Sequence, residues 1–134
     1  MSEAEAASAL GEIVEDRLLD GRLLLRQPRK GHRAGSDAIL LAAALPELGG
    51  GTLLDIGSGV GTIGLTAALL QPGLRIALLE RDPDIAALAK LNVSLNGLAD
   101  RAAVIAGDVT APAVQLAAAG LEAASFDAVA MNPP

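Results

Sequence analysis

From Thr52 onward, the sequence alternates short apolar runs with longer segments of helical periodicity, and this alternation limits the possible folds more than any other feature. Gly or Asp residues bound the apolar runs, as expected for strands that end in turns. The predicted strands are 52–56, 75–80, 102–106 and 126–131, and the predicted helices lie near 62–70, 83–96 and 111–119. Such alternation is typical of β-α-β units. The sequence therefore predicts an α/β fold with a Rossmann-like, doubly wound parallel sheet and the strand order 3-2-1-4.

Helix start and stop signals agree with this assignment. Pro83 and Pro112 suit the first turns of the second and third helices, where a backbone N–H has no helical partner. Asn96-Gly97 is expected to end the second helix. Upstream, Ser36 is the expected N-cap of an apolar helix from about residue 37 to residue 45. Because this helix is apolar on all sides, we expect it to be buried.

The first 35 residues differ in character and are predicted to form an N-terminal appendage of a helix and a hairpin with a basic segment, followed by the Rossmann-like domain at 36–134. Residues 3–20 are acidic and alanine-rich, and we expect them to be helical. Leu23-Leu24-Leu25, followed by Pro28, indicates a short strand. The basic residues gathered here either contact nucleic acid or solubilise a hairpin. They are Arg22, Arg26, Arg29, Lys30 and Arg33.

Composition excludes several kinds of chemistry. Without cysteine and with His32 as the single histidine, the chain offers no disulfide, thiolate zinc site or cysteine nucleophile, and no metal is expected. The net charge of -6 opposes general binding to nucleic acid. The longest apolar run, Ala38–Leu45, is too short to span a membrane, and the acidic N-terminus does not resemble a secretory signal. We expect a cytoplasmic protein without a membrane span; a monomer and a homo-oligomer are both compatible with the sequence.

Three glycines after the first predicted strand of the sheet indicate a ligand-binding loop. Gly57, Gly59 and Gly61 allow a sharp turn and a close approach of the backbone to a ligand, where a Cβ atom would collide. With Gly64 they include a GxGxxG pattern, which dinucleotide enzymes share, so the loop alone does not identify the cofactor. A tight strand-to-helix turn without a ligand is the alternative.

Three carboxylates narrow the choice of cofactor. Asp55 would repel a pyrophosphate and suits a cationic cofactor such as S-adenosylmethionine; alternatively, it only accepts hydrogen bonds from loop amides. Glu80 ends the second strand, where its carboxylate can accept hydrogen bonds from both hydroxyls of a ribose. Asp108 follows the third strand and either binds an adenine amino group or caps the next helix. The role of Glu80 would serve NAD and S-adenosylmethionine equally, so Asp55 is the residue that favours S-adenosylmethionine.

The sequence ends with Asn132-Pro133-Pro134, directly after the fourth predicted strand. In a doubly wound sheet this strand lies beside the first one, and ligands bind in the crevice at their carboxyl ends. The Asn132 side-chain oxygen and the Pro133 carbonyl can accept both hydrogens of an exocyclic amine and so localise its lone pair for attack. The prolines hold the backbone rigid. A turn that ends the strand is the alternative.

These motifs resemble those of the class I S-adenosylmethionine-dependent methyltransferases that carry an Asn/Asp-Pro-Pro-aromatic motif, over about residues 33 to 134. More narrowly, residues 27–41 resemble the N-terminal signature of the tRNA-valine adenine N6-methyltransferase family. In that family a glycine-serine/threonine-aspartate segment covers the cofactor, which implies this role for Ser36 and Asp37. The resemblance implies that the cofactor also meets Asp55, Gly57, Gly59, Gly61, Glu80 and Asp108, and that the catalytic motif is Asn132, Pro133 and Pro134.

The resemblance further implies methyl transfer to the N6 amine of an adenine in tRNA, with Arg29, Lys30 and Arg33 as the RNA contact. Protein glutamine N5-methylation uses the same catalytic motif, and the acidic net charge keeps this alternative open. A non-catalytic cofactor-binding fragment or partner subunit is a third hypothesis. It arises because the sequence ends before the aromatic residue of the motif, so we expect a truncated chain holding the N-terminal half of the fold.

Overall fold

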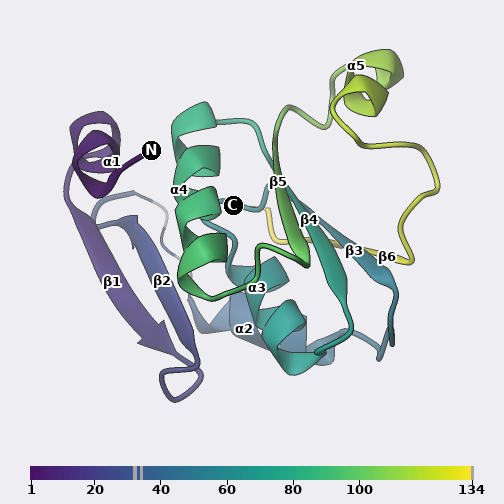
Figure 1. The fold of residues 1–134 in the computed structure, drawn as a ribbon, viewed down its shortest axis with the longest axis horizontal. Coiled ribbons are helices and arrows are strands. Elements are labelled where there is room, and N and C mark those ends of the chain that lie inside the picture. The colour runs from purple at the N-terminus through teal and green to yellow at the C-terminus, as the bar shows by residue number, and fades with distance from the viewer. Residues whose placement is uncertain (32, 34, 134) are drawn as a thin grey trace.

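The computed structural model describes residues 1–31, 33 and 35–133, which form a small N-terminal unit and a larger α/β unit (Figure 1). The N-terminal unit consists of α1 (Glu3–Leu10), β1 (Ile13–Leu18) and β2 (Leu23–Pro28). The larger unit consists of α2 (Ser36–Ala44), β3 (Thr52–Ile56), α3 (Thr62–Leu70), β4 (Arg75–Glu80), α4 (Pro83–Leu95), β5 (Ala102–Ala106), α5 (Ala113–Ala118) and β6 (Ala128–Met131). No helix in the described part of the chain is long and apolar enough to cross a membrane.

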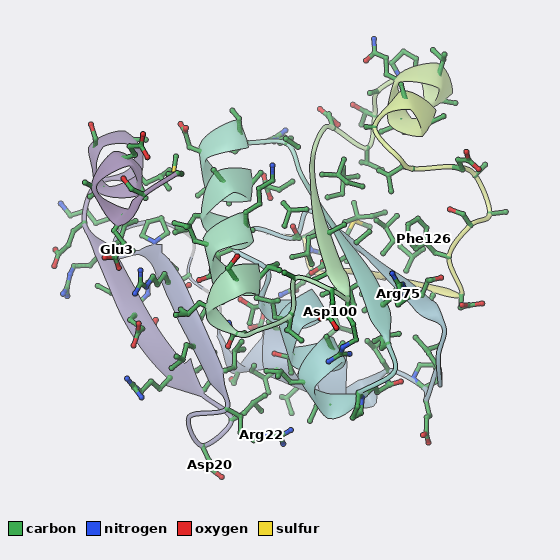
Figure 2. The ribbon with its side chains drawn as sticks, viewed as in Figure 1. Glu3, Asp20, Arg22, Arg75, Asp100 and Phe126 are labelled. Carbon is green, nitrogen blue, oxygen red and sulfur yellow. The ribbon has the colours of Figure 1, made fainter. Side chains whose placement is uncertain are left out.

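The N-terminal unit is a helix followed by an antiparallel hairpin, so the prediction of a helix through residue 20 is wrong. Gly11 has a φ of 80°, a conformation that stops α1, and the β-branched pair Ile13-Val14 opens β1. The turn between β1 and β2 contains Asp20 and Gly21, both with positive φ. Asp-Gly between apolar runs is a hairpin signal, and the hairpin predicted for this appendage is present, but its first strand lies in the stretch predicted to be helical. Figure 2 shows Asp20 at the tip of this hairpin.

The larger unit contains a parallel sheet with the order β5-β4-β3-β6, which agrees with the predicted order. The bounds of β3, β4 and β5 also agree with the prediction. The last strand, β6, begins two residues later than predicted. Just before it, the Asp127 N–H donates to the Thr52 carbonyl over 3.0 Å and the Asp127 carboxylate accepts the Thr52 N–H over 2.8 Å. Leu53 pairs with Ala128 and Ile56 pairs with Met131. Consequently, the residues that follow β3 and β6 leave the sheet side by side.

Helices α3 and α4 pack on the sheet and enclose the core, which includes the fully buried Leu53, Leu65 and Leu78. The hairpin packs against α4 through β2. At the other end of the sheet, β6 pairs only with β3 among the described residues, and Val129 and Met131 on it are both 56% exposed. Thus β6 has a neighbour on one side only.

Two helices differ from their predictions. Helix α2 starts at Ser36 and its N-cap is Gly35, so Ser36 is not the cap. The helix was also expected to be buried, but Leu40 is 67% exposed, because α2 meets α3 on one side, where Ala38 and Ala42 are buried. Helix α5 is shorter than predicted, has no buried residue, and stands away from the sheet in Figure 1. Pro83 begins α4 and Asn96 caps its C-terminus, as predicted. Pro112 is the N-cap of α5 and does not lie in its first turn, contrary to the prediction.

Candidate active site

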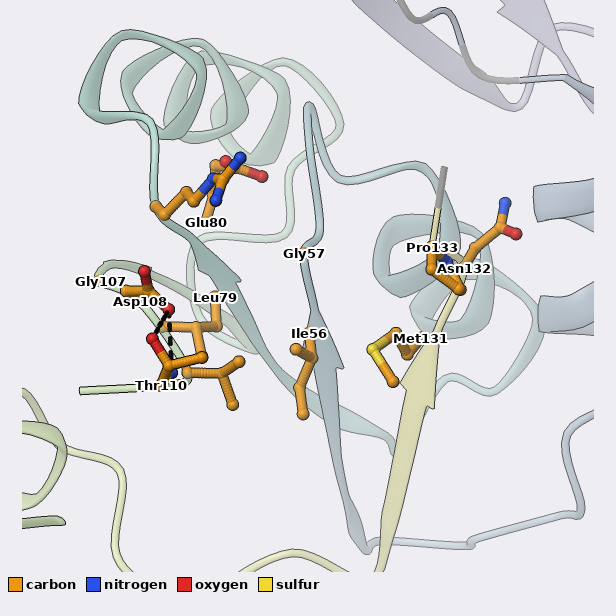
Figure 3. Close-up of a pocket in the computed structure, with 12 residues that line it drawn as sticks. Ile56, Gly57, Leu79, Glu80, Gly107, Asp108, Thr110, Met131, Asn132 and Pro133 are labelled. Carbon is orange, nitrogen blue, oxygen red and sulfur yellow. Dashed lines mark hydrogen bonds between the residues drawn. The ribbon is translucent and has the colours of Figure 1, made fainter. Parts of the chain in front are cut away.

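A pocket of about 450 Å³ lies at the carboxyl ends of β3 to β6. It brings together five predicted site residues from four segments of the chain: Gly57, Glu80, Asp108, Asn132 and Pro133. Figure 3 shows Gly57 between Glu80 on one side and Asn132 on the other. The remaining predicted cofactor residues do not line the pocket, and Pro134 lies outside the described residues.

The glycine loop has the backbone conformation that its sequence suggested. Gly57, Gly59 and Gly61 have φ values of 64°, 56° and 102°, which residues other than glycine rarely adopt. A Cβ atom added to Gly57 or Gly59 would meet nothing within 4 Å, so these two residues face open space. At Gly61 an added Cβ would come within 3.1 Å of Leu65. The loop therefore leaves room for a ligand at its first two glycines and packs on the core at the third.

Glu80 lines the pocket and also supports the loop. Its Oε2 atom accepts the Gly59 N–H over 2.8 Å, and its Oε1 atom accepts the Asp82 N–H over 3.0 Å. Both carboxylate oxygens are thus oriented by backbone groups at the end of β4. A carboxylate held in this way keeps further lone pairs for hydroxyl donors of a ligand.

Asp108 is held at the rim of the pocket by its own turn. Its Oδ1 atom accepts the Thr110 N–H over 2.8 Å and the Thr110 hydroxyl over 2.7 Å. These bonds lower the pKa of the Asp108 carboxyl, with a smaller contribution from the Arg81 charge. The predicted alternative of a helix cap is not observed, because the N-cap of α5 is Pro112. Sequence reasoning missed Thr110, although Asp-x-Thr is a known pattern for such turns.

Asp55 lies beneath the loop and is fully buried. Its Oδ2 atom accepts the Gly64 N–H over 3.1 Å and so satisfies a backbone donor in the first turn of α3, whose N-cap, Gly61, has no side chain. The Oδ1 atom has no hydrogen-bond partner among the described residues. Burial raises the pKa of the Asp55 carboxyl to about 7, and the nearby Glu80 charge adds to this effect. The bond from Gly64 agrees with the alternative in which Asp55 accepts a hydrogen bond from a backbone amide.

Asn132 leaves β6 next to the position where Gly57 leaves β3. In Figure 3 its amide group points away from Glu80 and Asp108. The Nδ2 atom donates a hydrogen bond to Asp37 Oδ2 over 3.2 Å. Because an ionised carboxylate only accepts hydrogen bonds, this contact determines which end of the amide carries the nitrogen. The Oδ1 atom is then the end that can accept hydrogen bonds from a substrate.

The basic residues of the N-terminal unit are paired with acidic residues. Arg29 contacts Glu12 at 2.8 Å, and Arg33 contacts Asp16 at 2.5 Å. Arg26 pairs with both Glu3 and Glu15. The acidic partners of these arginines come from α1, β1 and the turn between them. Because they offset the arginine charges, the N-terminal unit is much less positive than the basic residues alone suggest.

Comparisons with known proteins show the family to which the chain belongs. A family model described as "methyltransferase small domain" matches residues 32–134. The tRNA1(Val) (adenine(37)-N6)-methyltransferase of Porphyromonas gingivalis is 32% identical over 106 residues, covering 76% of this chain and 40% of that protein. The release factor glutamine methyltransferase of Chlorobaculum tepidum is 30% identical over 95 residues, covering 71% of this chain and 31% of that protein.

Among solved structures, the Pyrococcus abyssi tRNA (uracil-54, C5)-methyltransferase in complex with S-adenosyl-L-homocysteine has a TM-score of 0.66. It is 25% identical and covers 92% of this chain and 28% of that one. The fold is thus that of an S-adenosylmethionine-dependent methyltransferase domain. The chain belongs to the methyltransferase small domain family. It spans about 40% of the length of the P. gingivalis relative.

The residues present fit S-adenosylmethionine as the cofactor. The open space beside Gly57 and Gly59 admits a ligand close to the backbone. The carboxylates of Glu80 and Asp108 at the pocket wall suit hydroxyl and amino donors of an adenosine. The unpaired Oδ1 atom of the buried Asp55 lies below the same loop, where a negative charge would favour a cationic ligand over a phosphate.

Proposed function

We propose that the protein transfers a methyl group from S-adenosylmethionine to the N6 amine of an adenine in tRNA. The main observation behind this proposal is the position of Asn132 and Pro133 in the pocket wall. They follow β6, which is the direct neighbour of β3, the strand that leads into the glycine loop. The hydrogen bond from Asn132 to Asp37 supports it, since it directs the amide oxygen to the role of acceptor. A relative named as a tRNA adenine N6-methyltransferase provides further support.

In this proposal the protein positions the two reactants and localises one lone pair. S-adenosylmethionine supplies a methyl group bonded to a positively charged sulfur. Asn132 Oδ1 and the Pro133 carbonyl would accept the two hydrogens of the amine, so that the nitrogen lone pair faces the methyl carbon. As the C–N bond forms, the C–S bond would break with its electron pair left on the sulfur, giving S-adenosylhomocysteine, and the nitrogen would release one proton to water. Glu80 binds the ribose hydroxyls, and Asp108 binds the adenine amino group of the cofactor. Holding both reactants in line removes much of the entropic barrier.

Protein glutamine methylation is the second candidate. A glutamine side-chain amide has a delocalised lone pair like that of an adenine amine, so the same two acceptors would serve it. The pairing of Arg26, Arg29 and Arg33 with acidic residues favours this candidate, because it weakens the attraction of the N-terminal unit for phosphate. A relative named as a release factor glutamine methyltransferase supports it too.

The acceptor can be identified by incubating the purified protein with methyl-labelled S-adenosylmethionine and either unmodified tRNA or a glutamine-containing release factor. Nucleoside mass spectrometry of the tRNA should detect N6-methyladenosine, and the protein acceptor should stay unlabelled. Label in glutamine and none in tRNA would support the second candidate and reject the first. Label in neither acceptor would count against both.

Reversing the charge of Lys30 should weaken tRNA methylation if the basic segment contacts phosphate. We expect Lys30→Glu to raise the KM for tRNA several-fold. The slope of the logarithm of the binding constant against the logarithm of the salt concentration should become shallower by about one. The matched control is Arg75→Glu, which changes the net charge equally at an exposed residue across the molecule from the hairpin (Figure 2). Steady-state kinetics at several salt concentrations measure both effects. Equal effects of the two variants would mean that only the overall charge matters.

A further inference from the structure

Two asparagine side chains, Asn92 in α4 and Asn96 at its C-terminal cap, bond to the backbone of β2 as a neighbouring strand would. Asn96 Oδ1 accepts the Leu24 N–H over 2.9 Å, and Asn96 Nδ2 donates to the Leu24 carbonyl over 2.7 Å. One helical turn earlier, Asn92 makes the same pair of bonds with Arg26, both over 2.9 Å. Leu24 and Arg26 alternate along β2, so the two amides satisfy the edge of β2 that β1 does not cover.

Asn92 makes one contact that Asn96 does not. Its Nδ2 atom also donates to the carbonyl of Val60 over 3.0 Å. Val60 lies between Gly59 and Gly61 in the glycine loop. A primary amide has two N–H hydrogens, and Asn92 uses one on the hairpin and the other on the loop. Asn92 is fully buried, so water does not compete for these bonds.

The bond to Val60 fixes a part of the loop that its other contacts leave free. Glu80 holds the N–H of Gly59, and the Ser58 carbonyl accepts the N–H of Gly61 over 2.9 Å. Neither contact holds the Val60 carbonyl. Because the Val60 carbonyl and the Gly61 N–H belong to one planar peptide, a bond to the carbonyl sets the orientation of the whole unit. The open side of Gly59, where the cofactor fits, is directly adjacent.

We infer that Asn92 is a positioning residue that couples docking of the β1–β2 hairpin to the order of the glycine loop, and thereby strengthens binding of S-adenosylmethionine. The coupling is reciprocal, so a bound cofactor holds the hairpin on α4 more firmly. Since β2 leads into the segment proposed to meet the substrate, the same contact links the two reactant sites. The inference rests on the cofactor and not on the proposed acceptor, so a binding experiment tests it whatever molecule is methylated.

Asn92→Ala and Asn96→Ala form a matched pair, because each variant loses one pair of amide bonds to β2 and only the first loses the bond to Val60. Calorimetric titration of the full chain with S-adenosylmethionine should show a Kd raised about five- to tenfold for Asn92→Ala. For Asn96→Ala the Kd should stay within about twofold of the parent value. Equal increases for both variants, or an increase for neither, would overturn the inference.

The unmodified protein provides a second test that needs no folded variant. The Arg26 N–H bonds to Asn92, and the Leu24 N–H bonds to Asn96, so the two amides report on the two contacts separately. Hydrogen exchange followed by NMR should show that S-adenosylmethionine slows exchange at Arg26 several-fold and leaves Leu24 nearly unchanged. Slowing at both amides to the same extent, or at neither, would contradict coupling through Asn92.

Discussion

Replacing Asn132 with alanine is expected to lower the rate constant of methyl transfer about 100- to 1,000-fold while the affinity for S-adenosylmethionine changes little. The amide oxygen of Asn132 is proposed to act on the acceptor amine, whereas the cofactor is held by the glycine loop and Glu80. Single-turnover kinetics with saturating cofactor measure the chemical step, and calorimetry measures the affinity. A rate constant close to that of the parent protein would reject the catalytic role.

Val129→Ala is the matched control for this variant. Val129 lies on β6, shortly before Asn132, but is exposed and does not line the pocket, so its truncation should leave the rate constant within about twofold. If Asn132→Ala raises the Kd for S-adenosylmethionine as strongly as it lowers the rate constant, Asn132 holds the cofactor and not the acceptor. The two measurements therefore separate the two roles of this side chain.

The second large effect concerns Asp55 and the dependence of stability on pH. Its pKa in the folded protein is raised from an ordinary value of 3.8 to about 7. Between these values the folded state keeps a proton that the unfolded state has released, so the free energy of unfolding falls as pH rises. The stabilisation is fully present below the unfolded pKa and is lost by the time pH has passed about 7. Its size is on the order of 4 kcal/mol at most.

Asp55→Asn removes this titration and keeps a side-chain oxygen that can accept the Gly64 N–H. Urea unfolding between about pH 4 and pH 8 should show the variant gaining stability relative to the parent protein as pH rises.

Asp108→Asn is a control in which the change of stability with pH has the opposite sign. The pKa of Asp108 is lowered, so its contribution is present at neutral pH and is lost as pH falls through the folded pKa. A stability difference between Asp55→Asn and the parent that does not vary with pH would show that Asp55 titrates normally.

The α/β unit could be predicted from the sequence because its signals are local and agree with one another. Each apolar run of the sheet is bounded by Gly or Asp, and the strand order follows from the winding rules of parallel sheets. The same rules place Gly57 beside Asn132 at the carboxyl ends of neighbouring strands, and the structure shows both in one pocket. The motif residues Gly57 and Gly59 also have the left-handed conformations that only glycine adopts readily.

What could not be predicted depends on contacts between distant segments. The acidic run around Glu15 and Asp16 has no helical or strand periodicity strong enough to decide its conformation, and pairing with β2 makes it a strand. The pairing partners of Arg29 and Arg33 are 17 residues away in each case, so the neutralised charge appears only in three dimensions. Asn92 and Asn96 had a visible signal, four residues apart on one helix face, but their partners are 66 and 72 residues away.

Among the described residues, the strands that support the two halves of the site differ in their number of neighbours. The cofactor side rests on β3 and β4, which have neighbours on both sides and a buried core. Asn132 depends on a single ladder that runs from Leu53–Ala128 to Ile56–Met131. Strands with few buried contacts open locally before the rest of a domain unfolds. Among the described residues, local opening of β6 would therefore move Asn132 away from the pocket while the glycine loop keeps its contacts with Glu80 and Asn92.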